Sequence, residues 1–446
     1  MSISFPIKEN QGSISSAESG VVSHLDDLFS FYAEIAATYG TPFYLYDAAK
    51  IEEQVLSLRS LLPTENSDIL FSFKSNPNPS VTGQMKIHGC RADLTSPGEI
   101  EAAQVAGFDL SKALYGGPGK SEGELIGAIL AGIRSFSMES VHDLKALSGA
   151  AASVGESVKA LLRINPQEAP KAKLAMSGVA SQFGFEEEDL RSDGEEIMAS
   201  AGPGVDLVGI HIYWGTQVGD AEALLDCFRR TVKIAEEISN DLRFPLEILN
   251  LGGGFPWPYS TIGVGPDLSP LTAGLEELFE ESSAAKNAEW WFESGRFLCA
   301  SSGTLVTRVM EVKTSKEKQF LILDTGIHHL GGMSGLGRIP RFSIDLEVPP
   351  SRANNEKIQV EVVGQLCTPL DCIGRRIKLP QVEPGDLVSV PNTGAYGPTA
   401  SVLGFLSRPT PAEILHRDGE ILSANRLRSG HETLEQRKSH HTHESH

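Results

Sequence analysis

Apolar and polar positions alternate along the chain in two different patterns. From about residue 42 to 300, short apolar runs of strand length are separated by stretches in which apolar residues recur at helical spacing. The apolar runs lie at 43–46, 69–73, 91–94, 113–115, 135–138, 160–164, 207–213, 246–251 and 290–292. Repeated strand–helix units of this length predict an α/β fold with a (β/α)8 TIM barrel. A doubly wound open sheet is the alternative, although none of these runs is followed by a Gly-x-Gly-x-x-Gly turn that opens a helix.

The pattern changes after about residue 305. The runs at 304–312, 319–324, 358–363 and 386–391 are rich in β-forming residues and are separated by glycine, proline and charged turns, as is typical of antiparallel strands. We therefore expect the barrel at 42–305 and a mainly antiparallel β domain made of residues 1–41 and 306–422. The polar segment 423–446 holds five of the twelve histidines. A disordered tail is expected there, with weak metal binding as the alternative.

Composition narrows the range of partners. The 58 acidic and 38 basic residues give a formal net charge of −20, which argues against nucleic acid and against anionic membrane surfaces. No apolar run reaches the roughly 18 residues of a membrane span, and the first residues lack the layout of a signal peptide. The five cysteines are odd in number and scattered. We expect neither a disulfide framework nor a metal site, and a cytoplasmic protein.

Residues that can carry chemistry follow the predicted barrel strands. Barrel enzymes keep their sites at the carboxyl ends of these strands, so we expect one shared site. Its candidate residues are Lys74, Asp93, Arg163, His211, Tyr213, Thr216, Gly252, Gly253, Gly254, Glu293, Gly295 and Arg296. Burial of a lysine such as Lys74 lowers its pKa, which would make the amine a nucleophile near neutral pH.

Taken together, these residue types suit pyridoxal 5'-phosphate. A lysine can bind the aldehyde, successive glycines let backbone N–H groups approach a phosphate, and a carboxylate such as Glu293 can keep a ring nitrogen protonated. Tyr213 could stack on the ring. Each residue alone also has a plainer interpretation, namely a paired lysine, a structural Glu293–Arg296 ion pair or a core tyrosine.

The chain resembles the fold-type III pyridoxal-phosphate decarboxylases, the family of diaminopimelate and ornithine decarboxylases, which is related in fold to alanine racemase. The resemblance runs in family order over roughly residues 40–405. Its motifs are Phe-Ser-Phe-Lys-Ser-Asn (71–76), Ala-Asp-Leu-Thr-Ser-Pro-Gly-Glu (92–99), Gly-Gly-Pro-Gly-Lys-Ser (116–121), Arg-Ile-Asn-Pro (163–166), Ser-Gln-Phe-Gly (181–184), Gly-Gly-Gly-Phe (252–255), Glu-Ser-Gly-Arg-Phe (293–297), the segment 367–371 and Gly-Ala-Tyr-Gly (394–397).

The resemblance implies a role for each matching residue. Lys74 would bind the cofactor covalently, and Glu293 would face its ring nitrogen. Cys367 would return a proton to the substrate after carbon dioxide has left, and in the family this cysteine comes from the partner subunit of a head-to-tail homodimer. The residues that the resemblance assigns to the phosphate are Gly252, Gly253, Gly254, Gly295, Arg296, Thr216 and Tyr396.

The departures from the family pattern concern the substrate. Tyr213 stands where well-known members have a histidine stacked on the ring. Members that act on a diamine place an acid directly after the cysteine, where this chain has Thr368. Candidate substrate residues are therefore Thr368 and Asp371, together with Arg338 and Arg341, which could meet a distal anion or lie on a solvated loop.

These departures are similar to a branch of the family that serves siderophore and antibiotic biosynthesis. The expected substrate is a modified, conjugated or carrier-protein-bound amino acid. Diaminopimelate decarboxylation is the alternative reaction, and a non-catalytic cofactor-binding homologue is the alternative of another class.

Overall fold

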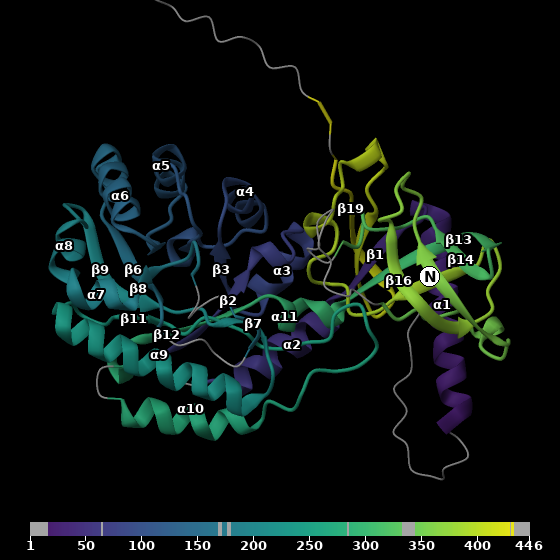
Figure 1. Cartoon of the computed structure of the whole chain (residues 1–446), viewed down its shortest axis with the longest axis horizontal. Helices are drawn as coiled ribbons and strands as arrows, with labels where there is room; N and C mark the ends of the chain where they lie inside the picture. The colour runs from purple at the N-terminus through teal and green to yellow at the C-terminus, as the bar shows by residue number, and fades with distance from the viewer. Residues whose placement is uncertain are drawn as a thin grey trace, which may run out of the picture.

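Two large sheets organise the part of the chain that the structure describes. The computed structural model describes residues 17–63, 66–167, 172–175, 180–282, 285–331, 344–428 and 430–431. An α/β barrel occupies one side of the molecule in Figure 1, and a sheet domain built from the N-terminal helix and the later strands occupies the other.

Eight parallel strands close into a barrel, as the sequence predicted. The strand order is β5-β4-β3-β2-β12-β11-β9-β6, and a further pairing between β5 and β6 closes the ring and rules out the open sheet. The strands are β2 (Ser67–Ser72), β3 (Arg91–Leu94), β4 (Leu114–Tyr115), β5 (Ser135–Met138), β6 (Val158–Asn165), β9 (Val205–His211), β11 (Ile248–Asn250) and β12 (Glu289–Ser294). The short β8 (Phe185–Glu186) pairs with β6, and β7 (Ala172–Ala175) pairs with β10 (Gly215–Val218).

Capping side chains begin several of the barrel helices. Ser96 accepts a hydrogen bond from the amide of Glu99 at 3.2 Å, and Asp220 accepts one from the amide of Ala223 at 2.9 Å. These contacts satisfy N–H groups that a helix start leaves unpaired. The helices are α2 (Ala48–Leu61), α3 (Pro79–Ile87), α4 (Pro97–Val105), α5 (Glu122–Leu130), α6 (Val141–Val154), α7 (Glu187–Ser192), α8 (Gly194–Ala199), α9 (Ala221–Leu242), α10 (Pro270–Glu281) and α11 (Arg296–Cys299).

The second sheet has the order β16-β15-β14-β13-β1-β18-β19, with β17 paired to β13. It is mainly antiparallel, as expected, with parallel pairs at β1–β18 and β14–β15. Its strands are β1 (Phe43–Asp47), β13 (Gly303–Ser315), β14 (Lys318–Leu323), β15 (Lys357–Val363), β16 (Cys372–Pro380), β17 (Leu387–Val390), β18 (Ala412–Arg417) and β19 (Glu420–Asn425).

One strand lies in a different sheet from the one predicted. The run at 43–46, expected as the first barrel strand, forms β1 and pairs with β13 and β18 in the second sheet. Helix α1 (Ala17–Tyr39) covers this strand, with Tyr32 and Ile35 in one buried cluster with Phe43. A buried apolar run looks the same in either sheet, so the pattern could not choose between them.

The C-terminal boundary also differs from the expectation. Strand β19 continues to Asn425, so the expected tail at 423–446 begins with paired residues, and residues 432–446 lie outside the described part. Among the described residues, no helix has both the length and the apolar character needed to cross a membrane.

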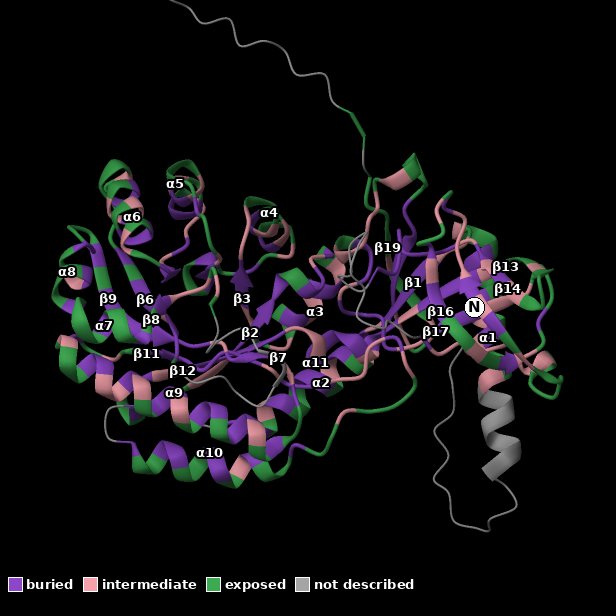
Figure 2. Cartoon of the chain, viewed as in Figure 1, coloured by how far each residue is buried: buried purple, intermediate pink, exposed green. Residues whose placement is uncertain are grey.

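The barrel interior is filled by apolar side chains. One buried layer comes from six strands and consists of Leu70, Leu114, Leu161, Val208, Ile248 and Trp291. Figure 2 shows that the barrel strands are buried along most of their length, while exposed residues lie on the outer faces of the helices. Since this layer fills the middle of the barrel, polar chemistry is confined to the strand ends.

Candidate active site

Lys74 lies at the carboxyl end of β2, in the short 3-10 turn Phe73–Ser75. Its Nζ is 5.4 Å from the centre of the Tyr213 ring, and its side chain keeps solvent-accessible surface although the neighbouring Phe73 and Ser75 are buried. The Lys74 side chain is therefore reachable from solvent at the carboxyl end of β2.

The electrostatic surroundings of Lys74 differ from the expectation. Protein atoms packed around the amine partly desolvate it and so lower its pKa, although the side chain reaches solvent. Asp93, the phenols of Tyr213 and Tyr396, and Glu293 outweigh this effect, so that the pKa is raised above its ordinary value. The predicted lowering was wrong because the folded chain gathers two carboxylates around this lysine. Lys74 is held as an ammonium by its own site.

Asp93 and Glu293 are buried carboxylates with opposite pKa shifts. Burial and the charge of Glu293 raise the pKa of Asp93 to about 7, although its carboxylate accepts a 2.7 Å hydrogen bond from the Ser72 hydroxyl. For Glu293, burial would raise the pKa, but His211, Lys74 and the Asn250 amide lower it to about 2. Glu293 is therefore ionised at neutral pH, whereas Asp93 exchanges a proton near neutrality.

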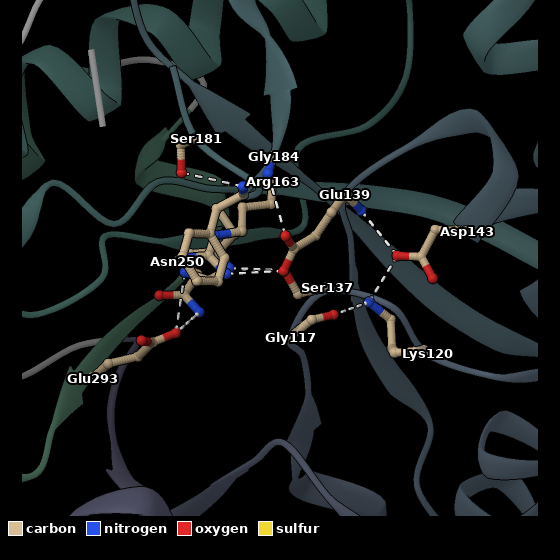
Figure 3. A network of polar contacts seen from close by, with 12 residues as sticks. Gly117, Lys120, Ser137, Glu139, Asp143, Arg163, Ser181, Gly184, Asn250 and Glu293 are labelled. Atoms are coloured by element: carbon tan, nitrogen blue, oxygen red, sulfur yellow. Dashed lines mark hydrogen bonds and ion pairs between the residues drawn. The ribbon is translucent and has the colours of Figure 1, made fainter. Parts of the chain in front are cut away.

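Two side chains contact Glu293, and a third contacts one of these two. Asn250 donates a 2.9 Å hydrogen bond to Oε1 of Glu293, and Nε2 of His211 lies 3.1 Å from the same oxygen. Nδ1 of His211 is 2.8 Å from the Ser137 hydroxyl. Figure 3 shows Asn250 beside Glu293, with Ser137 further along the network. These residues and His211 come from β11, β12, β5 and β9.

The glycine loop after β11 needs its three glycines. A Cβ atom on Gly252 would lie 2.5 Å from the carbonyl oxygen of Ile212, and one on Gly253 would lie 2.3 Å from that of Glu293. Gly252 and Gly254 have φ values of +68° and +103°, which favour glycine. The loop thus packs backbone against backbone between neighbouring strand ends, as an anion-binding loop requires.

Arg296 follows β12, the next barrel strand after β11, and begins helix α11. Its guanidinium group lies against two aromatic rings. Its guanidinium carbon is 5.0 Å from the ring centre of Tyr259 and 4.7 Å from that of Tyr396. Within the described residues, its buried Nε has no hydrogen-bond partner. Gly295 precedes it, and a Cβ there would lie 2.7 Å from the Cβ of Ser75. A fixed cation with a free buried donor suits a phosphate group.

Tyr396 and Thr216 complete the predicted phosphate set. The amide of Tyr396 donates a 2.7 Å hydrogen bond to the carbonyl of Ser75, the residue after Lys74. Thr216 lies on β10, partly buried. The residues present therefore fit pyridoxal phosphate, since the site contains an amine, an ionised carboxylate, a glycine loop and an arginine with an unused donor.

Arg163 belongs to a second polar network. Its Nη1 donates to Oε1 of Glu139 at 2.9 Å, and its guanidinium carbon is 4.6 Å from the centre of the Phe183 ring. The other oxygen of Glu139 accepts from the amide of Gly184 at 3.2 Å. Arg163 thus holds the loop after β6, and no described hydrogen bond or ion pair joins it to Lys74.

Sequence reasoning missed several members of these networks. Lys120 forms a buried ion pair with Asp143 at 2.7 Å, and Asp143 in turn accepts from the amide of Glu139 at 3.0 Å (Figure 3). Lys120 was visible as the lysine of the motif at 116–121. Glu139 and Asn250 directly follow or end barrel strands, so the rule that located Lys74 would also have found them.

The turn at 366–371 joins β15 to β16 in the second domain. Cys367 is exposed and Thr368 is partly buried on this turn. No described hydrogen bond, ion pair or ring contact links the turn to Lys74 or Glu293. Arg338 and Arg341 lie outside the described residues.

Asp371 does not present its carboxylate to the surface. It is 3% exposed, and its two oxygens accept from the amides of Ile327 and Leu366 at 2.9 and 2.7 Å. A Cβ on Gly326 or Gly364 would lie within 2.3 Å of the same carboxylate. The expected contact with substrate is therefore replaced by a structural role, because Asp371 anchors the turn that carries Cys367.

Known proteins resemble this chain over most of its length. A family model described as pyridoxal-dependent decarboxylase, pyridoxal binding domain, matches residues 48–300. The L-glutamyl-[BtrI acyl-carrier protein] decarboxylase of Niallia circulans is 34% identical over 87% of this chain and 92% of that protein. The diaminopimelate decarboxylase of Archaeoglobus fulgidus is 32% identical over 86% of this chain and 89% of that protein. The structure of Helicobacter pylori diaminopimelate decarboxylase complexed with L-lysine matches with a TM-score of 0.76 at 27% identity, over 89% of this chain and 95% of that one.

Proposed function

The chain belongs to the pyridoxal-dependent decarboxylase family, and we propose that it removes the free α-carboxylate of an amino acid held through its side-chain carboxyl group as a thioester on a carrier protein. The observation that carries this proposal is the chemistry of the turn at 366–371. Its one carboxylate, Asp371, is buried and engaged by two backbone amides, so the exposed turn offers the Cys367 thiol and the Thr368 hydroxyl. A free diamino acid would leave its distal ammonium without a carboxylate at this position.

The barrel residues would hold and tune the cofactor. Bound pyridoxal phosphate supplies the electron sink into which the electrons of the breaking carbon–carboxylate bond pass. Lys74 would hold its aldehyde, and the ionised Glu293 would keep a proton on the ring nitrogen. Tyr213 would stack on the ring, and Asp93, which titrates near neutrality, would exchange a proton with the Lys74 amine when substrate displaces it.

The phosphate would be bound by the glycine loop, Gly295 and Arg296. Backbone N–H groups of the glycine loop and of Gly295 would approach it closely, as the absence of Cβ atoms there permits. Arg296 would supply the cation, and Thr216 and Tyr396 the hydroxyl donors. Arg296 would balance the charge of the phosphate, as Glu293 would balance that of a protonated ring nitrogen.

Cys367 would act in the other subunit. We propose a head-to-tail homodimer in which the turn at 366–371 of one copy reaches the barrel mouth of the other. The thiol would then return a proton to the carbon that has lost its carboxylate. The exposure of Cys367 and the anchoring of its turn by Asp371 support this role.

Diaminopimelate decarboxylation is the second candidate, and it is favoured by relatives with that name, one of which is 32% identical. The two functions separate in one assay. Carbon dioxide release is measured with the purified, cofactor-loaded protein on L-glutamate joined through its side-chain carboxyl to the Niallia circulans carrier protein as a thioester, on free L-glutamate and on meso-diaminopimelate. We expect turnover of the thioester and little of the two free amino acids. Faster turnover of meso-diaminopimelate would overturn the proposal.

Two variants make this assay specific. Lys74→Ala should lose both turnover and the visible absorbance of the lysine-bound cofactor. Thr368→Asp restores an acid beside Cys367 and should raise turnover of meso-diaminopimelate relative to the thioester. Carbon dioxide release from none of the three substrates, in protein that binds the cofactor through Lys74, would favour a non-catalytic homologue instead.

A further inference from the structure

On one face of the second sheet, basic side chains outnumber acidic ones. The inner face of strands β13 to β16 is apolar and includes the buried Leu321, Val360, Val362 and Leu379. The pairs Lys313–Phe320, Ser315–Lys318 and Gln359–Lys378 lie on the opposite, outer face, since side chains alternate along each strand.

We name this outer surface the basic sheet face. Its cations are Lys313, Lys318, Lys357 and Lys378 on the strands, and Arg375 and Arg376, which protrude at an irregularity of β16 opposite Glu361. All six are exposed. The acids on the same face of these strands are Glu311 and Glu361. Its centre is apolar, with the half-buried Phe320 and Ile322.

The described residues give these cations no partner of opposite charge. Among the described residues, none of the six takes part in an ion pair or side-chain hydrogen bond. An excess of cations on one surface contrasts with the net charge of −20 of the whole chain. A lysine on an edge strand prevents that strand from pairing with another chain, which would explain Lys378 on β16. This reason does not apply to Lys313 and Lys318, which lie on inner strands.

We propose that the basic sheet face docks the acidic surface of the carrier protein that presents the substrate. The proposal rests on the carrier-bound substrate proposed above. Charge complementarity selects an acidic partner, and the half-buried Phe320 and Ile322 provide apolar contact at the centre. The strong negative charge of the rest of the chain repels the same partner elsewhere, so productive encounters are steered to this face.

The position of the face agrees with this role. Strand β16 begins at Cys372, directly after the turn that carries Cys367. A carrier protein bound to the outer face of β16 would therefore lie beside the turn that enters the composite site. Its flexible thioester arm could reach the barrel mouth from there without the carrier body entering it.

Charge reversal tests the proposal on two sets of strands. One variant carries Arg375→Glu, Arg376→Glu and Lys378→Glu on β16, and a second carries Lys313→Glu and Lys318→Glu on β13 and β14. The control variant reverses three exposed lysines on barrel helices, Lys86→Glu, Lys145→Glu and Lys233→Glu. It makes the same charge change as the first variant at a distance from the face.

Each variant is assayed with the carrier-bound L-glutamyl thioester and with a small L-glutamyl thioester of N-acetylcysteamine, both formed at the side-chain carboxyl of glutamate, at low and high salt. For both face variants we expect kcat/KM on the carrier substrate to fall about tenfold or more at low salt, mainly through KM, with the difference shrinking at high salt. Turnover of the small thioester should match wild type.

Three outcomes overturn the inference in different ways. Face variants that match the control variant on the carrier substrate show that the face does not dock it. A changed molar mass by light scattering, with equal losses on both thioesters, shows that the face joins two copies of this chain instead. If wild type turns over neither thioester, the proposed function itself fails.

Discussion

Replacing Asp371 by asparagine tests whether a buried carboxylate holds the turn that carries Cys367. The substitution keeps the size and shape of the side chain and removes its charge. Both oxygens of Asp371 accept backbone N–H groups, one from Ile327 at 2.9 Å and one from Leu366 at 2.7 Å. The side-chain oxygen of asparagine can accept one of these two hydrogen bonds. Its NH2 group then faces the other backbone N–H, and because both groups are donors, no hydrogen bond can form there.

The magnitude follows from these two contacts. A hydrogen bond to a charged group contributes about 1.5–3 kcal/mol, and a buried donor left without an acceptor costs about 1–3 kcal/mol. We expect Asp371→Asn to lower the free energy of unfolding by about 2–3 kcal/mol, and the melting temperature of this long chain by roughly 2–3 °C. Turnover should fall about tenfold or more, because the turn that places Cys367 is loosened.

Thermal and urea unfolding, together with carbon dioxide release, measure both effects. The control is Asp418→Asn, which removes the same charge from an exposed hairpin turn of the same domain and should change stability by less than about 0.5 kcal/mol. The reasoning is refuted if Asp371→Asn is as stable and as active as Asp418→Asn. Lost turnover with unchanged stability would instead indicate a direct contact with substrate.

Three further predictions concern other parts of the molecule. Cys367→Ala should reduce turnover by about 10²–10⁴ while cofactor affinity and melting temperature stay at wild-type values, and an unchanged rate would remove its role as proton donor. Gly253→Ala places a Cβ 2.3 Å from the carbonyl oxygen of Glu293, so calorimetry should show a loss of about 1–3 kcal/mol and titration a weaker affinity for the cofactor. Burial and the adjacent His329 lower the pKa of His328 from 6.5 to about 3. The unfolded chain therefore binds more protons, stability falls as the pH drops from 6.5 toward 3, and His328→Phe should lose less stability over that range than wild type.

The barrel was predictable, and the residues of the candidate site could be named, because these signals are local. Each strand–helix unit repeats the same alternation of apolar and polar positions, and the chemistry-bearing residues follow the strands at their carboxyl ends. Lys74, Glu293 and the glycine loop could therefore be assigned to one end of one barrel before their distances were known. The same rule applied to Glu139 and Asn250, which the sequence analysis left out.

Other features depend on partners that are distant in sequence. The run at 43–46 is apolar enough for either sheet, and its pairing with β13 and β18 was decided by segments more than two hundred residues away. Asp371 looked like a substrate ligand because its side chain is polar and near Cys367. Its burial depends on Gly326 and Gly364, which leave room for the carboxylate.

The sequence by itself determined the repeating units, the cofactor chemistry and the residue types at the strand ends, because these depend on short-range periodicity and on functional groups. Only the tertiary structure decided the charge states and the surfaces. It raised the pKa of Lys74 by bringing Asp93 and Glu293 beside it, and it assembled six cations from four strands into one face. Electrostatic energy depends on distance in space, and the order of residues along the chain does not contain that distance.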